Sequence, residues 1–566
     1  MKTQDLQRRV MALMADRKNV ESRWDAIERY VMPYRGQFFN DENGEATVDW
    51  RTRYMYDSTA VDAADKLASS MHGSLTSNVN QWFKIVFRDS ELNGDNDART
   101  WLEKCTEIIY LALKESNFDV VAPEAYHDLV GFGSSSVMEE IDGTYDAYKG
   151  LIFTCIAIRE CFFEMDAREK MYRFYRVLKW TPLQILDKFG EDCPQDIREK
   201  AQSSEHATDR IQVVYAIWRR DDVKVGDASK PLAPELRPFG TRYFLLENGD
   251  SLGKEDGCYE MPGYVLRWSK HADSQWGTSP AMKALADIMT LNALVELTLK
   301  AADVAVDPPI NVKVGATEGK INRGAGQINY VHDQNAITAF LSGARFDVSA
   351  MNVENLKEGI KRMFHIHELE LKESPAMTAT EVTVRYELLQ KLLGTTLGRL
   401  QSDFLNPMIE RTFAILYRAN QLPPAPEPVA NRQAHLDIEY IGPLSRIQKS
   451  DEVNNAERFL AILREYAEQW PELLDVIEPI ETALMIAGRL QVPATMTRKK
   501  KDIEAKQEER RQREQDARDT MYAEQADKAT RAGKQLAEMQ EKLGSQGMGP
   551  AAEAMPGAPQ QPAGTA

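Results

Sequence analysis

Two helical segments separated by a proline-centred break lie between residues 351 and 420, and this arrangement restricts the fold more than any other feature. Pro375 lacks an amide donor and disfavours helical angles at Ser374, so the first helix must end there. Thr378 and Glu381 then have the spacing of a capping box, which predicts that a new helix starts at once. The first helix is expected to begin at an N-cap on Asn352 and to carry an apolar face, made of Val353, Leu356, Ile360, Met363, Phe364, His367 and Leu371.

The second helix is expected to be long. Its apolar stripe runs from Val382 to about Tyr417, which corresponds to about 57 Å at 1.5 Å per residue. Pro407 is predicted to kink this helix, and Gly394 and Gly398 weaken it or permit close packing. The polar break between the two helices is therefore expected to act as a hinge between two rigid rods.

A third long helix is predicted upstream, over residues 280–302. Ser279 is its expected N-cap, Pro280 suits the first helical position, and Asp307-Pro308-Pro309 ends it. A short β-rich insert then leads back to the helix at 352–371, and its predicted strands are Ile310–Val314, Ile328–Tyr330 and Ile337–Leu341. Since the insert must join both helices, we expect the helices to lie antiparallel with the β-rich insert at one end.

The N-terminal half is expected to be α+β, with a mixed sheet flanked by helices. Its predicted helices are 5–32, 97–117, 122–131, 181–189, 194–202 and one after Ser58-Thr59 that ends before Gly73, with a small-residue face of Ala63, Ala64, Leu67, Ala68 and Met71. Its predicted strands are Gln81–Phe87, Leu151–Met165, Met171–Trp180, Ile211–Arg219, Tyr243–Glu247 and Tyr264–Trp268. With the long helices, the expected fold class is α+β and mainly helical.

The C-terminal part changes composition three times. A stiff proline-rich linker at 423–428 precedes a short strand, Leu436–Ile441, and a helical domain with predicted helices at 450–466, 471–477 and 479–490. From Arg498 to about Lys542 the chain is heavily charged, which is typical of a solvated helix or a coiled coil. Residues 545–566 are rich in Gly, Pro, Ala and Gln and are expected to be disordered.

Composition excludes several classes of protein. The net charge of −17 argues against gripping nucleic acid through an overall positive field, although a surface past which DNA slides remains compatible with it. Residues 1–24 lack the apolar core of a signal peptide, and no later apolar run is long enough to span a bilayer. The five cysteines are scattered and lack a CxxC pair, so we expect a reducing compartment without a zinc site or disulfide framework.

None of the candidate catalytic or binding motifs has the spacing or the residues that its chemistry requires. His365 and His367 diverge by about 200° on a helix and cannot chelate one ion. Gly315–Ile321 has three residues where a phosphate loop has four, and Gly131–Ser136 lacks the second glycine of GxSxG. The basic residues at 499–501 and 510–511 lie among acids, which favours a solvated helix over a nucleic-acid patch. We expect no catalytic activity, metal or cofactor.

Several motifs occur together in one order between residues 20 and 490. They are Tyr56-Asp57-Ser58-Thr59-Ala60 with Leu67-Ala68, Trp82-Phe83, Gly131-Phe-Gly133 with Glu139-Glu140, Trp276-Gly-Thr-Ser-Pro280 and Asp307-Pro308-Pro309. This pattern resembles the head-to-tail connector (portal) proteins of short-tailed bacteriophages, and Thr378–Arg385 is similar to that family's tunnel-loop exit. Where the family tends to have Tyr-Gly-Arg-Ser-Pro, this chain has Thr278, so no role of that arginine is carried over.

The resemblance implies a dodecameric ring at one capsid vertex, surrounding the channel for packaging and ejection of double-stranded DNA. The implied partners are the major capsid protein, a scaffolding protein, the terminase large subunit and tail adaptor proteins, in the virion and, during assembly, in the host cytoplasm. No membrane or cofactor is implied. The expected domains are a wing (1–277), stem helix 1 (278–305), clip (306–350), stem helix 2 (351–373), tunnel loop (374–380), long wing helix (381–420), linker (421–434), crown (435–497), charged helix (498–544) and disordered tail (545–566).

Two sets of residues are expected to carry the function. The tunnel loop facing DNA comprises Lys372, Glu373, Ser374, Pro375, Ala376, Met377 and Thr378, and the clip surface that docks terminase or tail proteins includes Lys313, Lys320, Arg323, Tyr330 and Arg345. Acidic channel walls suit sliding, because many cationic contacts would hold DNA tightly. Two alternatives remain open, namely a DNA-processing enzyme of the packaging apparatus, which needs clustered acidic metal ligands, and a helical tail adaptor or scaffold, which would be elongated and monomeric.

Overall fold

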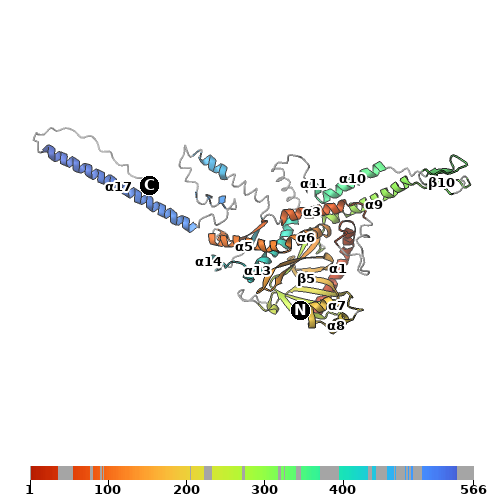
Figure 1. Ribbon diagram of the computed structural model, residues 1–566. Helices are drawn as coiled ribbons and strands as arrows, with labels where there is room; N and C mark the ends of the chain where they lie inside the picture. The colour runs from red at the N-terminus through yellow and green to blue at the C-terminus, as the bar shows by residue number, and fades with distance from the viewer. Residues whose placement is uncertain are drawn as a thin grey trace. The chain divides into compact units, whose positions relative to one another are not determined.

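The computed structural model describes most of the chain and is shown in Figure 1. The described residues are 2–35, 55–76, 81–89, 92–93, 95–203, 205–221, 232–270, 274–315, 320–323, 326–339, 346–369, 394, 396–430, 436–440, 456–464, 466, 479, 482–483, 486–487 and 500–544. They belong to two units, one that ends at Gln491 and a second that contains the C-terminal helix α17. The two units are described separately.

Two antiparallel sheets form the centre of the first unit. One has the order β4-β5-β6-β7-β8 and the other β3-β2-β9. Their strands are β2 Ser134–Gly143, β3 Tyr148–Ile156, β4 Cys161–Met165, β5 Met171–Trp180, β6 Ile211–Arg219, β7 Phe239–Leu245, β8 Ser251–Cys258 and β9 Gly263–Arg267. The predicted mixed sheet is wrong, since every strand pairing in the described ranges is antiparallel. The predicted single strand Leu151–Met165 is in fact β3 and β4, separated by a 3-10 turn, Ile158–Glu160.

The five-stranded sheet is covered on both faces. Successive strand residues point to opposite faces, and Val213 and Val214 accordingly join different apolar clusters. Val214 packs with Leu6 and Val10 of α1 (Thr3–Tyr30), whereas Val213 packs with residues of α7 (Pro182–Phe189) and α8 (Gln195–Gln202). Both short helices were predicted, and α7 begins at a capping box between Thr181 and Gln184.

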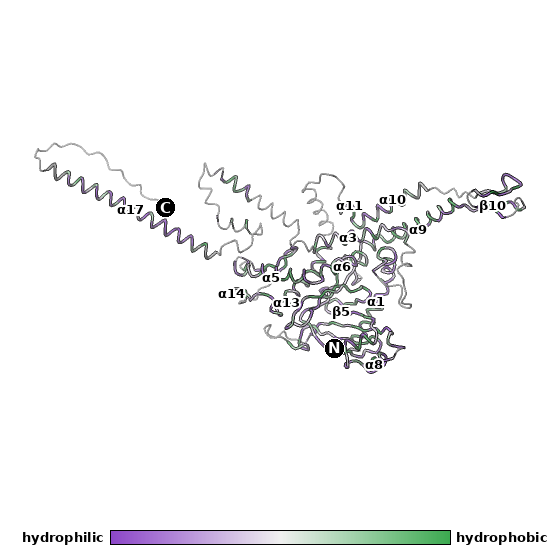
Figure 2. The backbone as a smooth tube through the Cα atoms, viewed as in Figure 1, coloured by the Kyte–Doolittle hydropathy of each residue, from purple (hydrophilic) through white to green (hydrophobic). Residues whose placement is uncertain are grey.

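The three-stranded sheet packs against helices that form the main core. These are α3 Thr59–Leu75, α5 Asn96–Glu115 and α6 Phe118–Phe132, together with part of α1. The predicted small-residue face of α3 is confirmed, because all five of its residues are buried, although the helix continues past Gly73. The hydrophobic residues gather in this region, whereas α17 is mostly hydrophilic (Figure 2). No helix in the described ranges combines the length and apolar character needed to cross a bilayer.

Two long helices extend from this core side by side (Figure 1). They are α9 Pro280–Val306 and α10 Phe346–Met363, joined by a hairpin of β10 Ile310–Val312 and β11 Ile337–Ala339. The first residues of α9 and the last residues of α10 enter the same core cluster, so the helices are antiparallel, as predicted. The predicted N-cap is also confirmed, since the Ser279 hydroxyl accepts a hydrogen bond from the Met282 amide at 2.9 Å.

Three predictions about this region are wrong. The second helix begins at Phe346, because no Gly or Pro interrupts residues 346–351, and Asn352 therefore lies inside it. Residues 328–330 form no strand. The single helix predicted over 352–371 is interrupted at His365, whose φ of 58° is left-handed, and α11 (Ile366–Leu369) follows.

The long helix predicted after residue 381 is described from residue 396. A π-helical turn, Gln401–Leu405, leads into α13, Asn406–Arg418. Pro407 cannot donate an amide hydrogen bond, so the bonding pattern of the preceding turn must change. The predicted kink at Pro407 stays a prediction, and the capping box at Thr378 and Glu381 lies outside the described residues.

The remaining elements lie near the C-terminus. The short helix α14, Glu427–Ala430, precedes β12, Leu436–Tyr440, which was predicted within one residue. This strand pairs antiparallel with β1, Phe83–Phe87. In the second unit, α17 (Lys500–Gly544) confirms the predicted charged helix and carries i,i+4 ion pairs such as Arg513 with Glu509. The tail at 545–566 lies outside the described residues.

Candidate functional site: the joint at the base of the helix pair

Motifs that are far apart in the sequence meet where α9 leaves the core. The Gly277 amide donates to the Ser134 hydroxyl at 2.8 Å, and the Ser279 hydroxyl donates to the Gly131 carbonyl at 2.7 Å. Ser279 therefore has two roles, since the same oxygen caps α9 and ties the helix to the end of α6. We call this contact the glycine joint, formed by residues 131–134 and 277–279.

The glycine joint requires two glycines in direct backbone contact. A Cβ added to Gly133 would lie 2.5 Å from the Gly277 carbonyl oxygen, and one added to Gly277 would lie 2.1 Å from the Gly133 carbonyl oxygen. Gly133 also has φ 76°, which favours glycine at the end of α6. The start of α9 is thereby held against the end of α6 without intervening side chains.

Two tryptophans cover the glycine joint. Trp24 of α1 and Trp276 pack edge to face with ring centroids 4.9 Å apart, and Phe163 of β4 packs against Trp276 at 4.8 Å. The Trp24 indole N–H donates to the Phe132 carbonyl at 3.0 Å, which satisfies its polar group inside the core. Both sheets and α1 therefore contribute to fixing the direction of α9.

A second contact holds the helix pair from the side of α3. The Asn292 side-chain oxygen on α9 accepts hydrogen bonds from the amides of Tyr56 and Asp57, at 2.9 and 3.2 Å. The Asp57 carboxylate accepts from the Thr59 amide at 2.9 Å and pairs with Lys357 of α10 at 2.9 Å. Burial raises the pKa of Asp57, but the hydrogen bonds from Thr59 and Lys357 outweigh it and the net pKa is lowered. Asp57 thus links α3 to both long helices.

A buried ion pair holds α13 against the three-stranded sheet. Arg411 of α13 and Glu139 of β2 are both buried, with Arg411 Nε 3.7 Å from a Glu139 carboxylate oxygen. Thr412 and Tyr264 donate hydroxyl hydrogen bonds to the same carboxylate, and Arg411 donates to the Glu260 carbonyl at 2.8 Å. Burial raises the pKa of Glu139 to about 6, partly opposed by the charge of Arg411. We call Glu139, Tyr264, Arg411 and Thr412 the α13 clamp.

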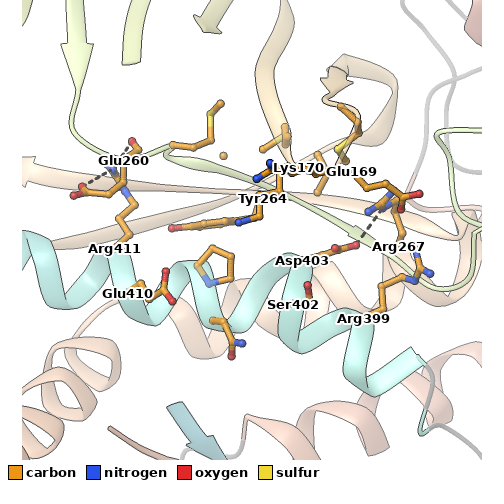
Figure 3. Close-up of a pocket in the computed structure, with 18 residues that line it drawn as sticks. Glu169, Lys170, Glu260, Tyr264, Arg267, Arg399, Ser402, Asp403, Glu410 and Arg411 are labelled. Atoms are coloured by element: carbon orange, nitrogen blue, oxygen red, sulfur yellow. Dashed lines mark hydrogen bonds and ion pairs between the residues drawn. The ribbon is translucent and has the colours of Figure 1, made fainter. Parts of the chain in front are cut away.

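A cavity of about 740 Å³ lies beside this clamp (Figure 3). It is bounded by the β4-β5 hairpin, β9, the π-helical turn and α13. Several of its charges are already paired, for example Arg267 with Asp403 at 3.1 Å. The described residues contain no cluster of His, Cys, Asp and Glu arranged to hold a metal ion. His367 instead lies 3.1 Å from the Glu358 carboxylate.

The contacts of two predicted clip residues are defined by the structure. Lys313 pairs with Asp333 at 2.7 Å, and Arg323 pairs with Asp307 and donates to the Pro308 carbonyl at 2.8 Å. Lys320 and Tyr330 are exposed. Arg345 lies outside the described residues, as does the whole predicted tunnel loop, Lys372–Thr378.

The reasoning from sequence did not identify Asn292 or Arg411 as structural contacts. Asn292 interrupts an apolar helical face, which is a detectable signal for a buried polar contact. Arg411 lies in an amphipathic helix with no local sign of its partner, since Glu139 is far away in the sequence. Glu139 was noted only as part of a motif.

Comparison with known proteins identifies the family of the chain. The model of a family described as bacteriophage head to tail connecting protein matches residues 3–497, which ends just before α17. The chain is 26% identical over 475 residues to a probable portal protein of Bordetella phage BPP-1, covering 82% of this chain and 83% of that protein. It is 24% identical over 528 residues to a portal protein of Salmonella phage epsilon15, covering 90% and 92%. The chain therefore belongs to the bacteriophage head-to-tail connecting proteins, a family of structural connectors and not of enzymes.

Proposed function

We propose that copies of this chain form a closed ring around a channel for double-stranded DNA, at one vertex of the capsid. In this ring α9 and α10 form the stem, the β10-β11 hairpin belongs to the clip, and the sheets with α1, α3, α5, α6, α7 and α8 form the wing. The pairing of β12 with β1 supports assigning residues 436–440 to the wing, so we place the start of the crown after Tyr440.

The observation that carries this proposal is the uncovered apolar surface of α9. Leu297 is 62% exposed and Val306 is 86% exposed, although both belong to a helix whose first half has one buried face. Residues seven apart share one side of a helix, so Val304 lies with Leu297, and Leu299 lies with Val306. The two pairs point about 200° apart at 100° per residue. Between them lie half-buried residues such as Thr298 and Ala301.

A helix with apolar residues on two separate sides fits a subunit that has two neighbours. A ring built from one kind of chain uses heterologous contacts, in which one surface of each subunit meets a different surface of the next. Groups of exposed large apolar side chains, such as those on α9, mark interaction sites in soluble proteins. The family resemblance supports twelve subunits, with the capsid protein, scaffolding protein, terminase and tail adaptors as partners in the virion and, during assembly, in the host cytoplasm.

Replacing Leu297 with glutamine is expected to reduce ring assembly while leaving the fold of each subunit intact. A side chain that is mostly exposed within the subunit contributes little to subunit stability, but it would be buried between neighbours. Native mass spectrometry at micromolar concentration measures the ring fraction directly. The matched control is Leu183→Gln, because Leu183 is 52% exposed on α7, away from the helix pair. Intact rings in the Leu297 variant would contradict the proposed stem contact, and wild-type monomers or twofold dimers would favour a tail adaptor or scaffold.

The tunnel-loop assignment leads to a separate test. We propose that Lys372–Thr378 projects into the channel and grips or gates DNA, since hinge loops between rigid helices absorb changes in angle. Deleting Glu373–Met377 while keeping Thr378 is expected to leave rings and empty heads but to reduce the DNA packaged or retained, measured by genome length in purified heads. Normal titres with full-length genomes would contradict the role, and loss of rings would make this segment a structural joint.

Docking at the clip is proposed for the surface that includes Lys313, Lys320, Arg323, Tyr330 and Arg345. Tyr330 is the best-supported anchor, because its ring is exposed and aromatic residues dominate interface energetics. The charges of Lys313 and Arg323 are each paired with an aspartate of the same region. These two residues would therefore contribute orientation more than affinity.

A further inference from the structure

Helix α17 carries an uncovered apolar stripe beyond the region shared with the family model. Every residue from Met521 to Met539 is exposed, including Tyr522, Leu536 and Met539. The family match ends at residue 497, before this helix begins at Lys500. The stripe therefore needs an explanation of its own, because large apolar side chains on an isolated helix are otherwise in contact with water.

The spacing of the stripe is that of a coiled-coil seam. Intervals of three and four residues alternate along one side, through Tyr522, Gln525, Ala529, Ala532, Leu536 and Met539. Positions a and d of a heptad repeat have this alternation, and they face a partner helix. The helix itself is supported locally, for example by the ion pair between Arg531 and Asp527, which lies outside the seam.

We propose that this stripe, residues 522–539, packs in parallel against the same stripe of other copies of the chain. This inference rests on the proposed ring, in which every copy carries one α17. The small side chains of Ala529 and Ala532 permit close approach of the helices. Gln525 is a polar residue in the seam, and such a residue specifies register at a cost in stability.

Charge does not oppose a second copy as the partner over this segment. In a parallel pair the residues flanking the seam meet across it, and they are Met521 with Ala526 and Lys528 with Gly533. Neither contact brings like charges together. Earlier in the helix the same seam would contain Glu508 and Arg511, which would each face an identical charge. The packed region therefore begins at about Tyr522 and does not extend through the N-terminal half of α17.

The seam is short, so the α17 helices of different copies are expected to pair only when the ring holds them close together. Two alanines and one glutamine bury little apolar area, and Tyr522, Leu536 and Met539 supply most of it. Tethering copies in one assembly gives effective concentrations on the order of millimolar for short linkers, which makes weak contacts persist.

The test is cysteine cross-linking in the full-length protein. Ala532→Cys places a thiol in the seam, and Lys534→Cys, two residues away, places one on the opposite side of α17. The wild-type chain sets the background, because its five cysteines are buried or half-buried. Disulfides require Cα atoms within about 7 Å, so mild oxidation of purified rings followed by non-reducing electrophoresis reports contact directly. Most chains of the Ala532 variant are expected to become cross-linked dimers, and the Lys534 variant is expected to match the background.

The outcomes separate this inference from the ring proposal. Rings that are intact by native mass spectrometry but show no cross-linking at residue 532, or equal cross-linking at 532 and 534, would overturn the coiled coil and leave the ring standing. A cross-link from residue 532 to a different protein in virions would also overturn it. Absence of rings would overturn the proposed assembly and, with it, this pairing.

Discussion

Replacing Arg411 with alanine is expected to destabilise the first unit strongly and to abolish assembly. Arg411 is 4% exposed, and its removal leaves the Glu139 carboxylate buried among Tyr264 and Thr412 without a cation. Breaking a buried pair from one side costs about 3–5 kcal/mol, a large part of the stability of a typical domain. The thermal unfolding midpoint, followed by circular dichroism, is expected to fall by roughly 3–5 °C for a unit of this size, or soluble protein is lost.

Two controls separate the buried charge from the mere loss of a side chain. Arg418→Ala on the same helix removes a more exposed ion pair with Glu260 and is expected to cost about 1 kcal/mol or less. The double variant Glu139→Gln with Arg411→Met removes both charges and is expected to recover much of the loss, because an uncharged pair avoids the desolvation cost. An Arg411→Ala melting curve that overlays the wild type would show that the α13 clamp contributes nothing.

The sequence predicted those helices and strands whose conformation is determined by their own residues. Met171–Trp180 and Ile211–Arg219 were predicted with their observed bounds, since both segments are rich in β-branched and aromatic residues. Ser279 and Pro280 mark the start of α9 in the sequence itself. The family resemblance came from several motifs, two of which, Gly131-Phe-Gly133 and Trp276-Gly-Thr-Ser-Pro280, the structure brings together at the base of α9, and the family match confirmed it.

The strands that were missed from the sequence are stabilised by pairing with strands elsewhere in the chain. β2 was missed because Ser134, Ser135 and Ser136 have low strand propensity, yet this central strand pairs on both edges and its first residues are buried. β8 contains Gly253 and Gly257 among charged residues, and its pairing with β7 outweighs its composition. The strand propensity of individual residues predicts little where pairing with distant strands determines the conformation.

The break between β3 and β4 shows the same limit. Leu151–Met165 is continuous in its strand-like composition, so the turn at Ile158–Glu160 has no local signal. Arg17 of α1 donates hydrogen bonds to the carbonyls of residues 158, 159 and 161, at 3.3, 2.7 and 3.2 Å. A cation from a distant helix thereby satisfies carbonyls that would otherwise pair in a ladder. The ion pair of the α13 clamp was not predicted for the same reason, since Arg411 and Glu139 are far apart in the sequence.

Replacing Gly277 with alanine is expected to disrupt the glycine joint. The added Cβ would lie 2.1 Å from the Gly133 carbonyl oxygen, and neither partner is a flexible side chain that could move aside. The end of α6 and the start of α9 would have to separate, breaking the hydrogen bonds of Ser134 and Ser279. The expected loss is on the order of 4 kcal/mol, with greatly reduced soluble protein or a lower unfolding midpoint.

The matched control for this prediction is Gly73→Ala. A Cβ at Gly73 meets no atom within 4 Å, and this residue lies inside α3, where alanine is favoured over glycine by about 1 kcal/mol. The control is expected to melt at or above the wild-type temperature and to form rings. Because the glycine joint sets the direction of α9, any folded Gly277→Ala protein is expected to lose rings even where its subunits remain soluble. Rings at the wild-type level in this variant would show that the direction of the helix pair does not depend on backbone contact between Gly133 and Gly277.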